Sequence, residues 1–154
     1  MPTEPEQVEM LSLMLPSDLK IEPFTKFKSF DQDEQPDGIL LVLRPVDRFG
    51  DPVKAAGSFY FELWAYNESD PMRKGERLAY WDRTIGTKQD VKLYWTRAQM
   101  YEFQLVWAAG AGQVRPGSKY LLTATYRPPW DETIQAEYLI QAPQASELFG
   151  KSME

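Results

Sequence analysis

Residues 38–66 read GILLVLRPVDRFGDPVKAAGSFYFELWAY, and this stretch decides the fold. It holds two apolar runs, residues 39–43 and 59–66, joined by a link that is rich in Asp, Gly and Pro. In the second run, Phe, Leu and Ala alternate with Tyr, Glu and Trp. Because strand side chains point to opposite faces with a period of two, the Phe, Leu and Ala side chains can be buried together. The first run is apolar throughout, which is typical of a strand covered on both sides, and Pro45 argues against a helix. The stretch therefore predicts two neighbouring core strands.

The same alternation recurs along the rest of the chain between clusters of turn residues. It predicts further strands at residues 19–27, 76–85, 91–95, 100–108, 118–127 and 134–140. Pro23 interrupts the first of these, which indicates an edge position or a bulge because proline cannot donate to a β-ladder. With long helices absent, the pattern predicts an all-β fold, an antiparallel two-sheet β-sandwich of about eight strands.

The N-terminal residues carry a different signal. Thr3 and Glu6 have the spacing of a capping box, which predicts a short helix over residues 4–14; an added edge strand is the alternative. The predicted organisation is an N-terminal segment at 1–17, a β-sandwich domain at 18–142 and a weakly ordered tail at 143–154.

Composition limits the functions that the chain can carry. Its 154 residues are enough for one domain with a real core, and an aromatic content of 14% is too high for a disordered chain. The net charge of −6 argues against binding to nucleic acid and disfavours adsorption to anionic membranes. The absence of Cys and His removes disulfides, thiolate and imidazole metal ligands, Cys nucleophiles and Ser–His–Asp triads. We expect neither a transmembrane segment nor an N-terminal signal peptide.

Two short motifs resemble those of known β-sandwich modules. Residues 115–122, RPGSKYLL, resemble the PG-x-x-Y entry to a late strand in immunoglobulin-like and transthyretin-like modules, which implies that the Tyr120 hydroxyl bonds back to nearby backbone as a tyrosine corner. Residues 47–53, DRFGDPV, are similar to a link of bacterial surface and macroglobulin-type sandwich domains. The resemblance implies a bacterial, extracytoplasmic module, periplasmic or associated with the cell envelope. A C2-type sandwich is the competing topology.

An acidic loop at residues 31–38, DQDEQPDG, is the candidate metal site. Calcium takes six to eight oxygen ligands, and Asp31, Asp33 and Asp37 would supply carboxylates. The loop resembles the D-x-D…P-D-G calcium repeats of extracellular proteins. If the strands alternate in direction, the acidic loop at 67–75 leaves from the same end of the sandwich. The competing interpretation is a solvated, Asp-rich turn that binds no metal.

Aromatic residues on the polar-alternating face of the second core strand form the candidate ligand surface. Tyr60, Trp64 and Tyr66 are the residues concerned, and exposed rings of this kind stack on sugar faces or contact proteins. Three further Trp residues have no assigned core position: Trp81, Trp95 and Trp130. The alternative is that these rings pack under loops, since Trp is buried on average.

No catalytic residue is predicted, and we expect the chain not to be an enzyme. The sequence instead predicts a non-catalytic binding or structural module that interacts with protein and needs no cofactor apart from the candidate calcium. The alternatives are a carbohydrate-binding module that uses its exposed Trp and Tyr, and a calcium-dependent C2-like domain.

Overall fold

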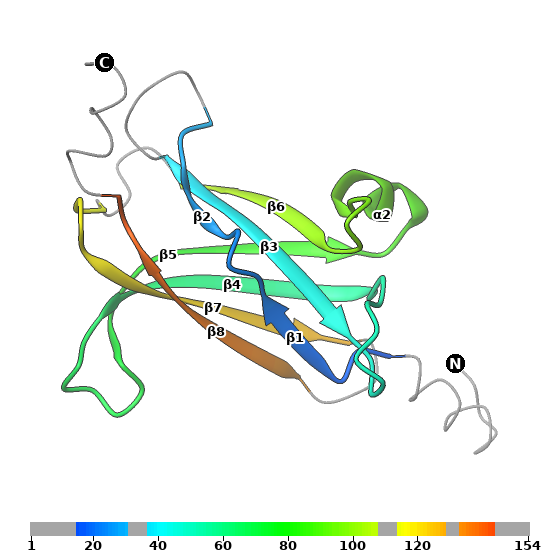
Figure 1. Ribbon diagram of the computed structural model, residues 1–154, viewed down its shortest axis with the longest axis horizontal. Coiled ribbons are helices and arrows are strands. Elements are labelled where there is room, and N and C mark those ends of the chain that lie inside the picture. The colour runs from blue at the N-terminus through cyan, green and yellow to red at the C-terminus, as the bar shows by residue number, and fades with distance from the viewer. Residues whose placement is uncertain (1–14, 31–36, 108–113, 129–132, 144–154) are drawn as a thin grey trace.

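The computed structural model describes residues 15–30, 37–107, 114–128 and 133–143 (Figure 1). These residues form two antiparallel sheets of four strands each. The narrow sheet contains β1 (Asp18–Ile21), β2 (Lys26–Lys28), β3 (Gly38–Val46) and β6 (Tyr101–Val106). The wide sheet contains, in spatial order, β5 (Lys74–Ile85), β4 (Gly57–Tyr66), β7 (Lys119–Arg127) and β8 (Ile134–Gln141). The helix α2 (Lys88–Tyr94) follows β5. The predicted all-β, two-sheet sandwich is confirmed.

The predicted N-terminal helix at residues 4–14 and nearly all of the predicted tail lie outside the described residues. Within the described part of the chain, β1 begins at Asp18 and β8 ends at Gln141. No helix there is long and apolar enough to cross a membrane.

The apolar run of β3, residues 39–43, follows from the central position of this strand. β3 pairs with β6 along one edge and with β1 and β2 along the other. Alternate residues of β3 face the wide sheet, where they meet the inward side chains of β4 and β7 in one core. The largest side chains of this core that are fully buried are Tyr101, Tyr126, Phe59, Phe61 and Phe103.

A break at Pro23 divides the predicted first strand into β1 and β2. Both halves still pair with β3, so they lie end to end along the same edge. The buried Thr25 side chain forms hydrogen bonds to β3 at the break. Its hydroxyl accepts from the Val42 N–H at 3.0 Å and donates to the Val42 carbonyl at 3.4 Å. The Glu22 N–H still donates to the Val42 carbonyl at 2.8 Å, so the Thr25 side chain replaces the acceptor that the Val42 N–H loses at the break.

The predicted strand at residues 91–95 is wrong, because α2 covers most of this segment. The helix begins with a capping box: the Thr87 hydroxyl accepts from the Asp90 N–H at 3.2 Å, and the Asp90 carboxylate accepts from the Thr87 N–H at 3.1 Å. These two bonds satisfy donors that a helix start leaves free. The strand count nevertheless stays at eight in the described residues, because the break at Pro23 makes two strands of one.

Both motifs that resemble sandwich modules form local hydrogen bonds. The Tyr120 hydroxyl accepts a bond from the Arg115 N–H at 2.7 Å, which is the contact expected of a tyrosine corner. In the link after β3, the Asp47 carboxylate accepts from the N–H groups of Phe49 at 2.9 Å and Asp51 at 3.0 Å. Each motif therefore fixes a chain reversal at the end of a strand.

The two sheets differ in width. Because β1 and β2 share one edge of β3, the narrow sheet is three strands across, whereas the wide sheet is four strands across. On one flank β1 runs beside β8 (Figure 1). On the other, which we call the open flank, β5 and β6 face each other without pairing, and α2 packs against both strands at one end. Among the described residues, no strand of the narrow sheet pairs with β5.

Candidate functional site

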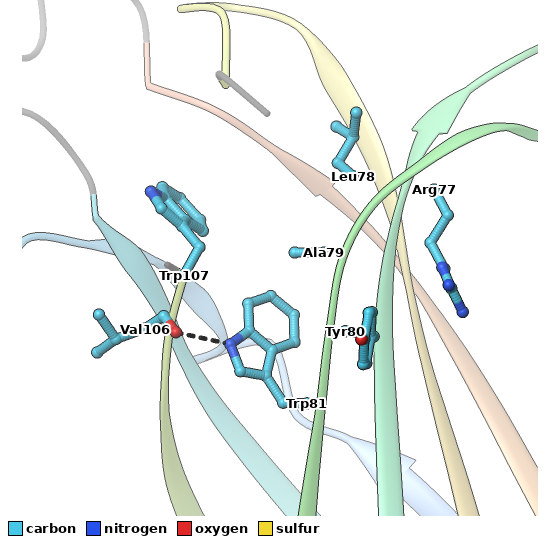
Figure 2. Close-up of a pocket in the computed structure, with 7 residues that line it drawn as sticks. All are labelled: Arg77, Leu78, Ala79, Tyr80, Trp81, Val106 and Trp107. Carbon is cyan, nitrogen blue, oxygen red and sulfur yellow. Dashed lines mark hydrogen bonds between the residues drawn. The ribbon is translucent and has the colours of Figure 1, made fainter. Parts of the chain in front are cut away.

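The open flank contains a groove of about 470 Å³ between β5 and β6 (Figure 2). Its lining residues are Arg77, Leu78, Ala79, Tyr80 and Trp81 of β5, Val106 at the end of β6, and Trp107. Most of these side chains are apolar or aromatic. The groove therefore offers a water-exposed surface with the chemistry of a protein interior.

A β-bulge turns two consecutive apolar residues of β5 toward this groove. Leu63 of β4 pairs with Ala79, whereas the next residue, Trp64, pairs with Arg77, so that Leu78 is an extra residue on β5. An extra residue interrupts the strict alternation of side chains. Leu78 and Ala79 both pack against the core, and Figure 2 shows them on the groove side of β5, with Arg77 on the other side.

Two side chains of β5 bridge the gap to β6, although the two strands do not pair. The indole N–H of Trp81 donates to the Val106 carbonyl at 2.8 Å (Figure 2), and the Arg83 guanidinium donates to the Gln104 carbonyl at 3.0 Å. These donors reach carbonyl groups on the edge of β6 that a neighbouring strand would otherwise satisfy. The Trp81 ring is almost completely buried and closes one end of the groove.

The rim of the groove on the β4 side is polar and internally paired. One guanidinium nitrogen of Arg77 donates to the Tyr60 hydroxyl at 3.0 Å and to the Glu62 carboxylate at 3.2 Å. The same guanidinium lies 4.6 Å from the centre of the Tyr80 ring, which is 60% exposed. The positive charge on the rim is therefore compensated within the fold, and the rim presents an aromatic ring to solvent.

Two side chains among the described residues, Asp90 and Tyr101, have clearly shifted pKa values, and both form hydrogen bonds within the fold, away from the groove. Hydrogen bonds from the Gly86 and Thr87 N–H groups and the Thr87 side chain lower the pKa of Asp90. Burial raises the pKa of Tyr101, whose hydroxyl donates to the Ala55 carbonyl at 2.8 Å, and the neighbouring Tyr126 adds to the shift. Neither group lines the groove.

The predicted aromatic residues are only partly brought together. Tyr60 and Trp64 lie on the outer face of the wide sheet, where the Tyr60 ring is 6.1 Å from the Tyr80 ring at an interplanar angle of 41°. The Trp64 ring lies under the Lys74 ammonium, 4.9 Å from its centre, and its indole N–H donates to a Thr side chain. Tyr66 lines a separate hollow at the end of β4.

Of the predicted calcium ligands, Asp31 and Asp33 lie outside the described residues. The Asp37 carboxylate accepts a hydrogen bond from the Phe30 N–H at 2.8 Å, and its backbone carbonyl accepts from the Trp107 N–H at 3.1 Å. Within the described ranges, no group of three or more acidic side chains is placed to hold a metal ion. The calcium site stays a prediction.

Sequence reasoning did not find the groove. The sequence marks Trp81 only as lacking an assigned core position, and it gives no reason to connect Trp107, which packs against the core and the Phe27 ring, with β5. The available signal was the pair of consecutive apolar residues at 78–79, which breaks the alternation of β5. Its meaning depends on pairing with β4, which a single strand sequence does not contain.

Comparisons with known proteins find no match: no family model, no curated protein and no solved structure is significantly similar to the chain.

Proposed function

We propose that the protein is a non-catalytic binding module that holds an apolar segment of another protein in the groove between β5 and β6. The observation that carries this proposal is the composition of the groove: two Trp side chains and the apolar Leu78 and Ala79 line a hollow open to solvent. Exposed apolar hollows rimmed by polar groups are typical of interaction sites.

The energetics favour an apolar protein ligand. Covering apolar surface contributes roughly 25 cal/mol for each Å² removed from water, so one or two aliphatic side chains seated in the groove would contribute a few kcal/mol. Trp, Tyr and Arg are the residues that most often dominate protein interfaces. The groove presents the Trp81 and Trp107 side chains, and Tyr80 and Arg77 lie next to it on the outer side of β5.

The arrangement of the outer face favours protein over carbohydrate. Sugar binding by stacking needs rings with free, roughly coplanar faces. The rings of Tyr60 and Tyr80 are inclined to each other, and cations already lie over Tyr80 and Trp64. A sugar would have to displace these cations, whereas the groove has apolar walls that already face solvent.

The proposal is tested by selecting peptides from a displayed library of random twelve-residue sequences. Selected peptides are then measured against Ala79→Trp, which fills the groove, and against Thr84→Trp, which adds the same side chain at an exposed position of β5 outside it. We expect affinity for A79W to fall about tenfold or more and affinity for T84W to stay unchanged.

Thermal melting establishes that both variants fold, and Ala79→Leu replaces A79W if the larger side chain prevents folding. Selection that enriches no binding peptide, or peptides that bind the filled and unfilled groove equally well, would overturn the proposal.

A further inference from the structure

Resting on the proposed function, we infer how the ligand binds: as an extended strand that pairs with the free edge of β6 and completes the narrow sheet. The partner segment is then defined by its chemistry, a short strand with apolar side chains on one face and polar side chains on the other. Binding by strand addition uses backbone hydrogen bonds for affinity and alternate side chains for specificity.

The first support is the unequal width of the two sheets. The wide sheet has a fourth strand, β5, for which the narrow sheet offers no counterpart among the described residues. α2 covers the end of this flank where the Tyr94 ring packs 4.9 Å from the Phe103 ring. The other end, beside Val106 and opposite Leu78 and Ala79, is the groove. A strand added next to β6 would lie in this place.

The second support is the backbone of β6. The carbonyls of Gln104 and Val106 accept bonds from side chains of β5, so they point away from β3. In an antiparallel ladder the N–H and C=O of one residue point to the same edge, so the N–H groups of these two residues lie on the free edge as well. This edge therefore carries donors and acceptors in the spacing of a strand. Trp81 and Arg83 now supply donors to its carbonyls, and a partner strand would take the place of these two donors.

The regularity of β6 makes it the pairing edge rather than β5. All six residues of β6 pair with β3 without a register shift. The groove half of β5 contains the bulge at Leu78 and the charged Lys74, Glu76 and Arg77. Bulges and charges are the features that keep an edge strand from pairing.

The surroundings of the added strand determine its side chains. Side chains on the inner face of the added strand would contact Leu78, Ala79 and the Trp107 ring. This face of the ligand therefore requires apolar residues of moderate size. On its outer face, the side chains would continue the solvent side of β6, where Glu102 and Gln104 are exposed, and this side requires polar residues. The ligand is thus an amphipathic strand and not a helix.

The probe is the peptide KVTVTVTK, which alternates apolar and polar residues, and its affinity is measured by calorimetry. Two isomers carry N-methyl groups on the valines or on the threonines, so that each isomer blocks one edge of the extended peptide. We expect one isomer to bind about tenfold or more weakly and the other to bind within about threefold of the parent, because only one edge faces β6.

Hydrogen exchange supplies a second readout. Saturating KVTVTVTK should slow exchange of the Gln104 and Val106 amide hydrogens about tenfold or more. Arg83→Met removes the donor that occupies the Gln104 carbonyl, and should tighten binding of the peptide about threefold, whereas Arg127→Met on β7 should leave binding unchanged.

The outcomes separate this inference from the proposed function. If both methylated isomers bind like the parent, or if KVTVTVTK does not bind while library-selected peptides bind the groove, strand addition is overturned and the binding module stands. If the selected peptides ignore the groove as well, both proposals fail.

Discussion

The indole N–H of Trp81 donates a 2.8 Å hydrogen bond to the backbone carbonyl of Val106, across the gap between two strands that do not pair. A side chain from one sheet thus satisfies a main-chain group at the edge of the other. With the similar contact from Arg83 to Gln104, it ties the open flank together.

Trp81→Phe should lower the free energy of unfolding by about 2 kcal/mol, because it removes a buried hydrogen bond and leaves space where the second ring of the indole was. Chemical denaturation monitored by circular dichroism measures the change. Trp64→Phe is the matched control: Trp64 is only half-buried, so its loss should be clearly smaller. Equal losses in the two variants would mean that the bridge contributes nothing specific.

The tyrosine corner gives a second prediction. Tyr120→Phe removes only the hydroxyl that accepts from the Arg115 N–H, and should cost about 1 kcal/mol of stability. Tyr138→Phe on β8 is the control, since the Tyr138 hydroxyl has no hydrogen bond to the described residues and its loss should be close to neutral. Denaturation midpoints compare the two, and an unchanged midpoint in Y120F would contradict the role of the corner.

The capping box of α2 predicts a dependence on acid. Hydrogen bonds from the Gly86 N–H and from Thr87 lower the pKa of Asp90 below its ordinary value of 3.8, so this carboxylate stabilises the fold above that pH, and the contribution is lost as the pH falls through the lowered pKa. Asp90→Asn should flatten the acid side of the stability profile. Thr87→Ala should cost about 1 kcal/mol at neutral pH. A profile of D90N parallel to that of the unchanged protein would contradict the assignment.

Buried Tyr101 predicts a dependence on alkali. Because burial raises its pKa above 10.0, the folded protein holds this proton more tightly than the unfolded chain does. The contribution of Tyr101 to the free energy of unfolding is therefore fully present below pH 10 and declines as the pH rises above it. Tyr101→Phe should lose about 1–3 kcal/mol at neutral pH, because the Ala55 carbonyl loses its donor, and should show a shallower alkaline decline. Unfolding at a series of pH values measures both, and an equally steep decline in Y101F would refute the argument.

Asp37 separates the two interpretations of the acidic loop. Asp37→Ala removes the acceptor of the Phe30 N–H and should lower stability by about 1 kcal/mol to the same extent with calcium and with EDTA. If calcium raised the melting temperature of the unchanged protein but not that of D37A, the metal site predicted at Asp31, Asp33 and Asp37 would be supported instead, since a ligand stabilises the state that binds it.

The sequence predicts the strands more completely than it predicts the candidate site. The alternation of Phe59, Phe61 and Leu63 was sufficient to predict β4 and its buried face, because the pleat alone determines which side chains share a side. The segment 91–95 is mostly helical instead of a strand, because Thr87 and Asp90 cap a helix that begins just before it.

The groove is a property of pairing rather than of any one segment. Leu78 turns to the same side as Ala79 only because β4 holds the neighbouring residues in register. Trp107 lies opposite β5 only because the sheets stack with unequal widths. Periodicity within one strand does not encode either relationship, so a largely correct list of strands still leaves the site unassigned.

The difference in width also limits how these molecules could assemble. A sandwich that could pair with other molecules along both flanks would assemble into fibres, because each added copy would leave one unpaired strand edge for the next copy. Among the described residues, β1 runs beside β8 on one flank, and the strand addition proposed above uses the other flank, that of β5 and β6. Once a partner strand is bound along this flank, no unoccupied site of this kind is left. The expected stoichiometry is therefore one partner to one molecule, and assembly does not continue beyond this complex.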